Sequence, residues 1–225
     1  MALAPAAPVR AQDDEPARAD ALGIGQMPIP QPFTPEQRFL HAARTGDRAT
    51  LRVALERGVA PTARDDLGRN ALLLAVRDAN RLDLAKMLHE KGVPLDEPDI
   101  GGRAALSWAA AEGRLEAVRW LVEQGAKVDR RESDARTPLI HAAAGGHGEV
   151  VAFLLDRGAA VNAADRFGDT ALMMACSKGQ DATAELLLQR GADPSQRNQE
   201  GRTAADVAAP GSAVCRSAGA LQSPR

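Results

Sequence analysis

Few side chains in this sequence are of the types that usually perform catalysis or bind metals. There are four histidines, at positions 41, 89, 141 and 147, and two cysteines. His41 and His141 occupy the same position of a repeating pattern, three units apart, so stacking of the units separates them. Adjacent carboxylates such as Asp13-Asp14 and Asp65-Asp66 fit a solvated arm and a turn. Catalysis needs a nucleophile, a base and an orienting group that converge, so we predict no enzyme activity, cofactor or metal.

The two cysteines allow two interpretations. Cys176 takes the second place of a recurring Ala-Ala pair, which suits a small buried hydrophobic residue. In an oxidising compartment it could instead form a disulfide with Cys215, near the end of the chain. Both alternatives stay open at this point.

Composition excludes several classes of protein. Of 225 residues, 44% are hydrophobic but only 3% are aromatic, so the core must be built from Ala and aliphatic side chains. The net charge of −2 argues against a nucleic-acid partner, which usually requires a basic surface. No apolar run approaches the roughly 20 residues of a membrane span, so none is expected.

A period of 33 residues organises the middle of the chain. Glycines recur after similar apolar-basic stretches at positions 58, 92, 125, 158 and 191. A second series, always ten residues later, has glycine at 68, 102, 168 and 201 but Ala135 in the fourth unit. One extra residue near Asp78-Ala-Asn-Arg81 explains the single step of 34. Such a period is typical of stacked repeats that cannot bury their faces alone.

The fourth unit, residues 136–165, carries the clearest motifs. It contains Thr-Pro-Leu, Ala-Ala-x-x-Gly-His-x-Glu-Val-Val, Leu-Leu-x-x-Gly-Ala and Val-Asn-Ala in that order. This sequence resembles the ankyrin repeat, and the resemblance implies an all-α solenoid of paired antiparallel helices with hairpin-like turns. Five copies are recognisable, at about 35–66, 67–99, 100–132, 133–165 and 166–198, within a repeat domain spanning 34–211. A partial cap at 199–209 retains the turn and first helix.

No unit retains the family's Thr-Pro-Leu-His tetrapeptide intact, and the histidine that usually ties neighbouring turns is missing from it. We therefore expect apolar packing, rather than a polar network, to hold the stack. The substitution of Ala135 predicts an altered turn in the fourth unit, and the inserted residue predicts that the second unit is the least regular.

The resemblance implies a non-catalytic scaffold, monomeric, that binds a protein through its turn tips and the concave face of its inner helices. The candidate binding residues are Leu67, Arg69, Ile100, Arg103, Trp108, Arg136, Phe167, Asp169 and Arg202. Five of these form an arginine column broken once, by Asp169. The column suits an acidic partner, but arginine is also this chain's default surface cation. A surface role predicts that Arg103→Glu together with Phe167→Ala abolishes partner capture without lowering stability. Trp108 fits inter-repeat packing better than a binding hot spot.

The two ends differ from the middle. Proline-rich residues 1–33 predict a disordered arm, and residues 1–11 resemble the last part of a signal peptide without a basic region. Residues 212–225 predict a flexible tail. The signal-like segment and an Ala/Arg-rich, Lys-poor composition typical of bacteria favour the periplasm or export over the cytoplasm. The alternative function is that of a secreted effector acting on a foreign target.

Overall fold

The computed structural model describes residues 33–218, of which residues 34 onward belong to one compact unit. The predicted arm, apart from Phe33, and the signal-like residues 1–11 lie outside the described residues. So does the end of the tail, from residue 219.

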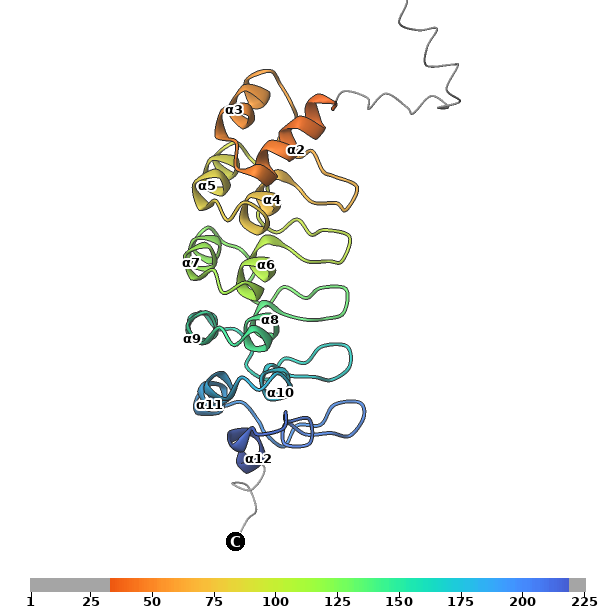
Figure 1. Ribbon diagram of the computed structural model, residues 1–225, viewed down its shortest axis with the longest axis vertical. Helices are drawn as coiled ribbons and strands as arrows, with labels where there is room; N and C mark the ends of the chain where they lie inside the picture. The colour runs from red at the N-terminus through yellow and green to blue at the C-terminus, as the bar shows by residue number, and fades with distance from the viewer. Residues whose placement is uncertain (1–32, 219–225) are drawn as a thin grey trace, which may run out of the picture. The chain divides into compact units, whose positions relative to one another are not determined.

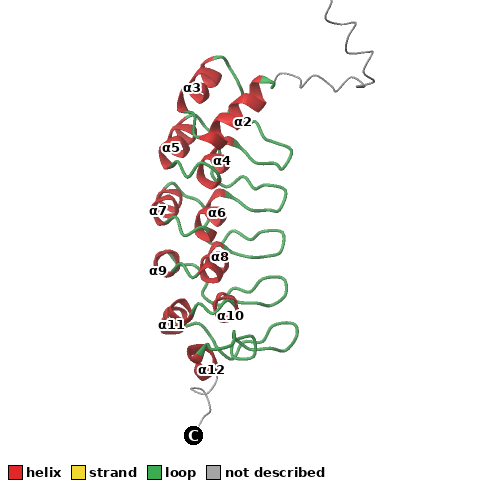
Figure 2. Ribbon diagram, in the orientation of Figure 1, coloured by secondary structure: helices red, strands yellow, loops and turns green. Residues whose placement is uncertain are grey.

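Antiparallel helix pairs follow one another along the chain and stack in that order (Figure 1). The pairs are α2 (Pro35–Thr45) with α3 (Arg48–Glu56), α4 (Ala71–Arg77) with α5 (Leu82–Glu90), α6 (Ala105–Ala111) with α7 (Leu115–Glu123), α8 (Pro138–Gly145) with α9 (Gly148–Asp156), and α10 (Ala171–Ser177) with α11 (Asp181–Gln189). A last helix, α12 (Ala213–Ala218), follows them. The described residues contain no named strand, and this confirms the predicted all-α solenoid (Figure 2).

The inner helices α2, α4, α6, α8 and α10 form one continuous column. Side-chain caps start four of them: Thr34, Asn70, Thr137 and Thr170 each accept a hydrogen bond from the backbone three residues on. Helices of seven to eleven residues are too short to be stable alone. They gain stability by stacking, and small residues such as Ala109-Ala110, which are fully buried, let neighbouring helices approach closely.

Hairpin-like loops join each outer helix to the next inner helix, and all project on the same side of the stack (Figure 1). Successive loops lie so close that a β-carbon on Gly102 would sit 2.6 Å from the backbone nitrogen of Ser133. Gly102 also has a φ of +83°, which side chains disfavour. The loop between α7 and α8 keeps this left-handed conformation with Ala135 at φ 61°, so the turn type persists at the cost of backbone strain.

The inserted residue of the second unit changes the link between α4 and α5. Asn80 adopts φ 48°, and asparagine tolerates this left-handed conformation better than other non-glycine residues. Elsewhere the corresponding link uses Gly113, Gly146 or Gly179, all with positive φ. The insertion is therefore absorbed locally, without interrupting the helix column.

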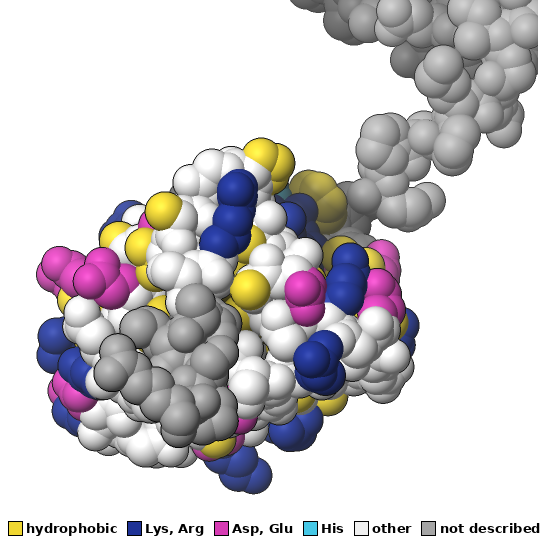
Figure 3. Space-filling view, turned by 90° about the horizontal axis from the view of Figure 1, so that it is seen from below, with side chains coloured by type: hydrophobic (Ala, Val, Ile, Leu, Met, Phe, Trp, Pro, Cys, Tyr) yellow, Lys and Arg dark blue, Asp and Glu magenta, His cyan; other side chains and the backbone are white. Residues whose placement is uncertain are grey.

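At the C-terminal end the structure differs from two predictions, the flexible tail and the first helix of the partial unit. Residues 213–218 were expected to be a flexible tail, but they form α12, which packs on α11 (Figure 1). Seen from this end of the stack, charged and hydrophobic side chains are interspersed on the visible surface (Figure 3). Cys215 on this helix is completely buried and forms a disulfide with Cys176 of α10. Ser212 accepts a hydrogen bond from the amide of Cys215 and donates one to Asp181. A helix this short has no detectable periodicity, and its order comes from these tertiary contacts.

The partial unit at 199–209 was expected to keep its first helix, and this is wrong. Residues 204–207 form only a turn, in which Thr203 and Asp206 bond each other's amide and side chain. Pro210 has no amide hydrogen and cannot extend a helix from this turn. The amide of Ala209 instead donates to the carbonyl of Cys176 at 2.9 Å, so this segment covers the end of α10.

The disulfide closes a loop of 39 residues and holds the C-terminal cap. Cys215→Ser should lower the free energy of unfolding by about 2–4 kcal/mol, mainly because the unfolded chain gains entropy. Urea unfolding with and without dithiothreitol measures the effect. The control is Cys176→Ala with Cys215→Ala, whose stability should not respond to the reductant. Equal stability of the parent protein in both conditions would contradict the prediction.

Ala135→Gly should raise the free energy of unfolding by about 0.5–1 kcal/mol, because glycine relieves the left-handed strain. Ala160→Gly is a matched control at an exposed loop position that lacks a positive φ, and it should be neutral or destabilising. Thermal and urea unfolding of both variants provide the test, and a loss of stability in Ala135→Gly would show that the turn is unstrained.

Candidate functional site

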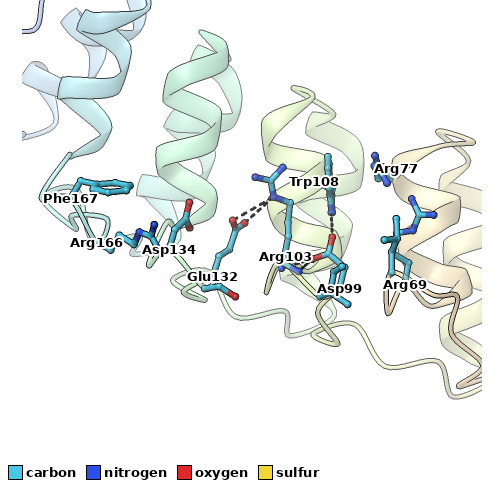
Figure 4. Close-up of a pocket in the computed structure, with 13 residues that line it drawn as sticks. Arg69, Arg77, Asp99, Arg103, Trp108, Glu132, Asp134, Arg166 and Phe167 are labelled. Carbon is cyan, nitrogen blue, oxygen red and sulfur yellow. Dashed lines mark hydrogen bonds and ion pairs between the residues drawn. The ribbon is translucent and has the colours of Figure 1, made fainter.

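A depression of about 550 Å³ lies between the hairpin loops and the inner helices. We call it the tip groove. It is lined by residues of four consecutive hairpins, together with Arg77 of α4 and Trp108 of α6 (Figure 4). It brings together six of the predicted binding residues: Leu67, Arg69, Ile100, Arg103, Trp108 and Phe167. Asp169 and Arg202 border a separate depression nearer the C-terminus, and Arg136 lines neither.

An aspartate or asparagine shapes most of the hairpins. Asp65 Oδ1 accepts hydrogen bonds from the amides of Leu67 and Arg69, and its carboxylate also pairs with the Arg69 side chain. Asp99, Asp165 and Asn198 accept the corresponding pair of amide hydrogen bonds. Such side-chain caps fix the turn, and so fix where the tip residues lie.

The pKa of Asp65 reflects this arrangement. Burial raises it, but the hydrogen bonds from Arg69 and Leu67 and the charge of Arg69 outweigh burial, so the pKa lies below its ordinary value. The ionised form is therefore the one that the fold stabilises. This contribution is present above the ordinary aspartate pKa and is lost as pH falls through the lowered one.

The predicted arginine column connects successive hairpins. Arg103 pairs with Glu132 at 3.3 Å, and Arg136 pairs with Asp165 at 3.2 Å, in each case 29 residues along the chain. Where the column is interrupted, Asp169 accepts a hydrogen bond from Asn198 Nδ2 at 2.8 Å, also 29 residues on. At this position the column has a carboxylate in place of a guanidinium, and the partner on the next hairpin is an amide in place of a carboxylate.

Other polar contacts join the units, so the expectation that packing alone holds the stack is wrong. Asp96, Asp129 and Asn162 each accept the amide of a residue 31 positions later. At the start of outer helices α7 and α9, Arg114 and His147 donate to carbonyls at the end of the inner helix of the previous repeat, α4 and α6 respectively. Cationic and N–H donors suit these carbonyls, which the helix itself leaves unpaired.

The hairpin between α7 and α8 departs from the others because Glu132 stands where they have aspartate or asparagine. Its side chain is 3% exposed and lies 2.9 Å from His141 Nε2 as well as beside Arg103. Asp134 takes over the cap of this turn by accepting the amide of Arg136. His141 thus contacts the hairpin through Glu132. It stands one residue after position 140, where the family's tetrapeptide has its histidine and this sequence has Ile140.

Trp108 is held from three sides. The guanidinium groups of Arg77 and Arg103 lie 4.1 and 4.3 Å from its ring centre, on opposite sides of the ring (Figure 4). Its indole N–H donates to Asp99 at 3.2 Å. Each stacking contact stabilises the arrangement through the electron-rich ring faces. Trp108 is therefore a rigid wall of the tip groove, with only part of its surface exposed.

Apolar side chains at the hairpin tips are exposed. Ile100 is 72% exposed, Phe167 46% and Leu67 45%. Backbone bonds fix this row: the amide of Ile100 donates to Leu67, and the amide of Gln199 donates to Phe167. The tips are therefore pre-organised, and little conformational entropy remains to be lost on binding.

The sequence reasoning missed Arg77 and Arg166. Arg77 ends α4 at a position occupied by Ala111, Ala144 or Ser177 in the later units, and that exception was the available signal. Arg166 is exposed at a hairpin tip next to Phe167, and no feature of the repeat pattern distinguishes it as a binding residue. The histidines do not converge, and within residues 33–218 no cluster of three potential metal ligands occurs.

The family model of ankyrin repeats (three copies) matches residues 39–132 and 129–198. The chain belongs to the ankyrin repeat family. A search of curated proteins found no significant match. Ankyrin repeats are generally protein–protein interaction modules, and the family is typically non-catalytic. None of the described helices of this ankyrin repeat chain is long and apolar enough to cross a membrane.

The buried partner of Arg103 revises its predicted role as a freely replaceable surface residue. Arg103→Glu would place a carboxylate against Glu132 and should lower the free energy of unfolding by about 2–4 kcal/mol. Arg202→Glu is the matched control, because Arg202 holds the same column position but is 49% exposed. That control should change stability by less than about 0.5 kcal/mol. Urea unfolding tests both, and equal effects would mean that the Arg103–Glu132 pair does not hold the hairpins.

Proposed function

We propose that this ankyrin repeat protein is a non-catalytic scaffold that binds a protein partner through the tip groove and its bordering hairpin tips. The exposed apolar row carries the proposal. Leu67, Ile100 and Phe167 come from different repeats, yet all border one depression. Exposed apolar side chains that gather beside charged groups are typical of protein interfaces.

The charged residues of the column have a secondary role in this proposal. Arg136 and Asp169 each bond a residue of the next hairpin, so they hold the hairpins in place and are not free to bind a partner. Trp108 acts in the same way, as a preformed wall. The separation of the histidines supports a scaffold without catalysis, because no acid, base and nucleophile approach one another.

We also propose that the protein works in an oxidising compartment, the bacterial periplasm or beyond it. The buried disulfide between Cys176 and Cys215 supports this, since such bonds persist in exported proteins and are rare in reducing compartments. The signal-like character of residues 1–11 supports it independently. Export does not decide between a periplasmic scaffold and a secreted effector, and the location of the partner separates them.

Crosslinking of the tagged full-length protein in its native cell, followed by fractionation and mass spectrometry, tests the function. Ile100→Ser with Phe167→Ser should reduce recovery of the partner at least tenfold, because the apolar contact is lost. Val53→Ser is the control: Val53 is 39% exposed but lies on α3, outside the tip groove.

Equal recovery with the tip variant and the parent protein would contradict binding at this surface. Recovery of the protein from the cytoplasm with both cysteines reduced would contradict export. A partner crosslinked in the periplasm supports the periplasmic scaffold, and release into the medium supports the effector.

A further inference from the structure

Three acidic residues line the tip groove, and all three are already bonded. Asp134 is 31% exposed and pairs with Arg136 at 3.4 Å, whereas the other two are less available. Glu132 is 3% exposed and contacts Arg103 and His141. The carboxylate of Asp99 accepts hydrogen bonds from the amides of Gly101 and Arg103 and from the indole of Trp108. These carboxylates have little capacity to meet a ligand, and their charge is offset locally.

The basic groups face outward instead. Arg166 is exposed, with its guanidinium 4.8 Å above the ring of Phe167. Arg77 is 31% exposed and stacks on Trp108. A guanidinium that stacks face-on over a ring keeps its N–H edges available for a carboxylate. In Arg77 the Nε edge already pairs with Asp78 at 3.5 Å, so its terminal N–H groups are those that can meet a ligand. The groove therefore presents positive charge to solvent, although the whole chain is slightly acidic.

The groove has two different sides. Leu67, Ile100 and Phe167 are apolar and lie in the hairpins, with Arg166 beside Phe167 at one end of this row, whereas Arg77 and Trp108 belong to the inner helices. Side chains of an extended peptide point alternately to opposite sides. A peptide lying along the groove would thus direct every second residue to the apolar tips and the others to the inner helices, where Arg77 lies.

The hairpins also limit the length of such a peptide. From Leu67 to Phe167 the groove crosses three repeat steps, and helices pack about 8–10 Å apart, which corresponds to roughly seven to nine extended residues. Exposed carboxylates at Asp66 and Glu200 flank this stretch and disfavour further acidic residues beyond it. A compact folded surface would not fit the alternation as well.

We propose that the tip groove binds an extended segment of a protein partner, about nine residues long, in which acidic and apolar residues alternate. The inference rests on the proposed function and specifies the chemistry of the partner. The carboxylates pair with Arg77 on the side of the inner helices and with Arg166 at the Phe167 end of the groove, and the apolar side chains pack on Ile100 and Phe167.

Three fluorescein-labelled nonapeptides test the proposal by fluorescence anisotropy with the full-length oxidised protein. One alternates Leu and Glu, the second alternates Leu and Lys, and the third contains Glu alone. The Leu/Glu peptide should bind at least tenfold more tightly than either control, and more weakly as salt screens the arginines. Equal binding of the Leu/Lys peptide, or of Glu alone, would overturn it.

Variants locate the binding. Arg166→Gln and Arg77→Gln should each weaken binding of the Leu/Glu peptide about three- to tenfold, since each removes a charge-assisted contact. Arg52→Gln is the control, because Arg52 is 72% exposed on α3, away from the groove. Thermal unfolding verifies that each variant is folded. In a Trp120→Phe background, a fluorescence change on binding reports on Trp108 directly.

Competition by a nine-nucleotide oligothymidylate tests a phosphate polymer, which arginines also bind. Displacement of the Leu/Glu peptide at equal concentration would overturn the proposal in favour of a nucleic acid. If no peptide binds while Ile100→Ser with Phe167→Ser still abolishes partner capture, this inference fails and the scaffold function stands. If the tip variant leaves capture unchanged, both fail.

Discussion

Each repeat leaves backbone groups unpaired at the ends of its short helices and hairpins, and the adjacent repeat supplies the missing partners. Inner helices of seven residues have more unpaired end groups than internal bonds, so they depend on these contacts. His147 reaches the carbonyl of Ala111, and Asp129 accepts the amide of Ala160. The stack is therefore a set of nearest-neighbour couplings, and the position of every tip residue follows from them.

Most of the fold was predictable because the repeat recurs. A period that places small residues in one column and glycines in two others admits few structures, and the helix pairs follow from it. The C-terminal end was not predictable in this way. Helix α12 occurs once, has six residues, and depends on a disulfide and on Ser212, none of which has a repeating signature.

The candidate site was predictable in position but not in chemistry. The turn glycines located the tips, and exposed Leu67, Ile100 and Phe167 indeed border one groove. Sequence could not show that Arg103 and Arg136 face carboxylates 29 residues away, because such pairing depends on the rise and rotation between repeats. Within the arginine column the informative irregularity was Asp169, whose partner is an amide, Asn198, where Arg136 has a carboxylate.

The same couplings that build the stack determine the charge of its groove. Asp99 caps a hairpin and Glu132 anchors an arginine, and both carboxylates are engaged within the protein. The cations that balance these groups are longer, and their guanidinium planes reach the surface or stack on Trp108. The tip groove thus presents guanidinium groups to solvent, while carboxylates such as that of Glu132 are buried beneath them. Selectivity for acidic ligands then arises from the direction of the side chains, and net charge carries little information about it.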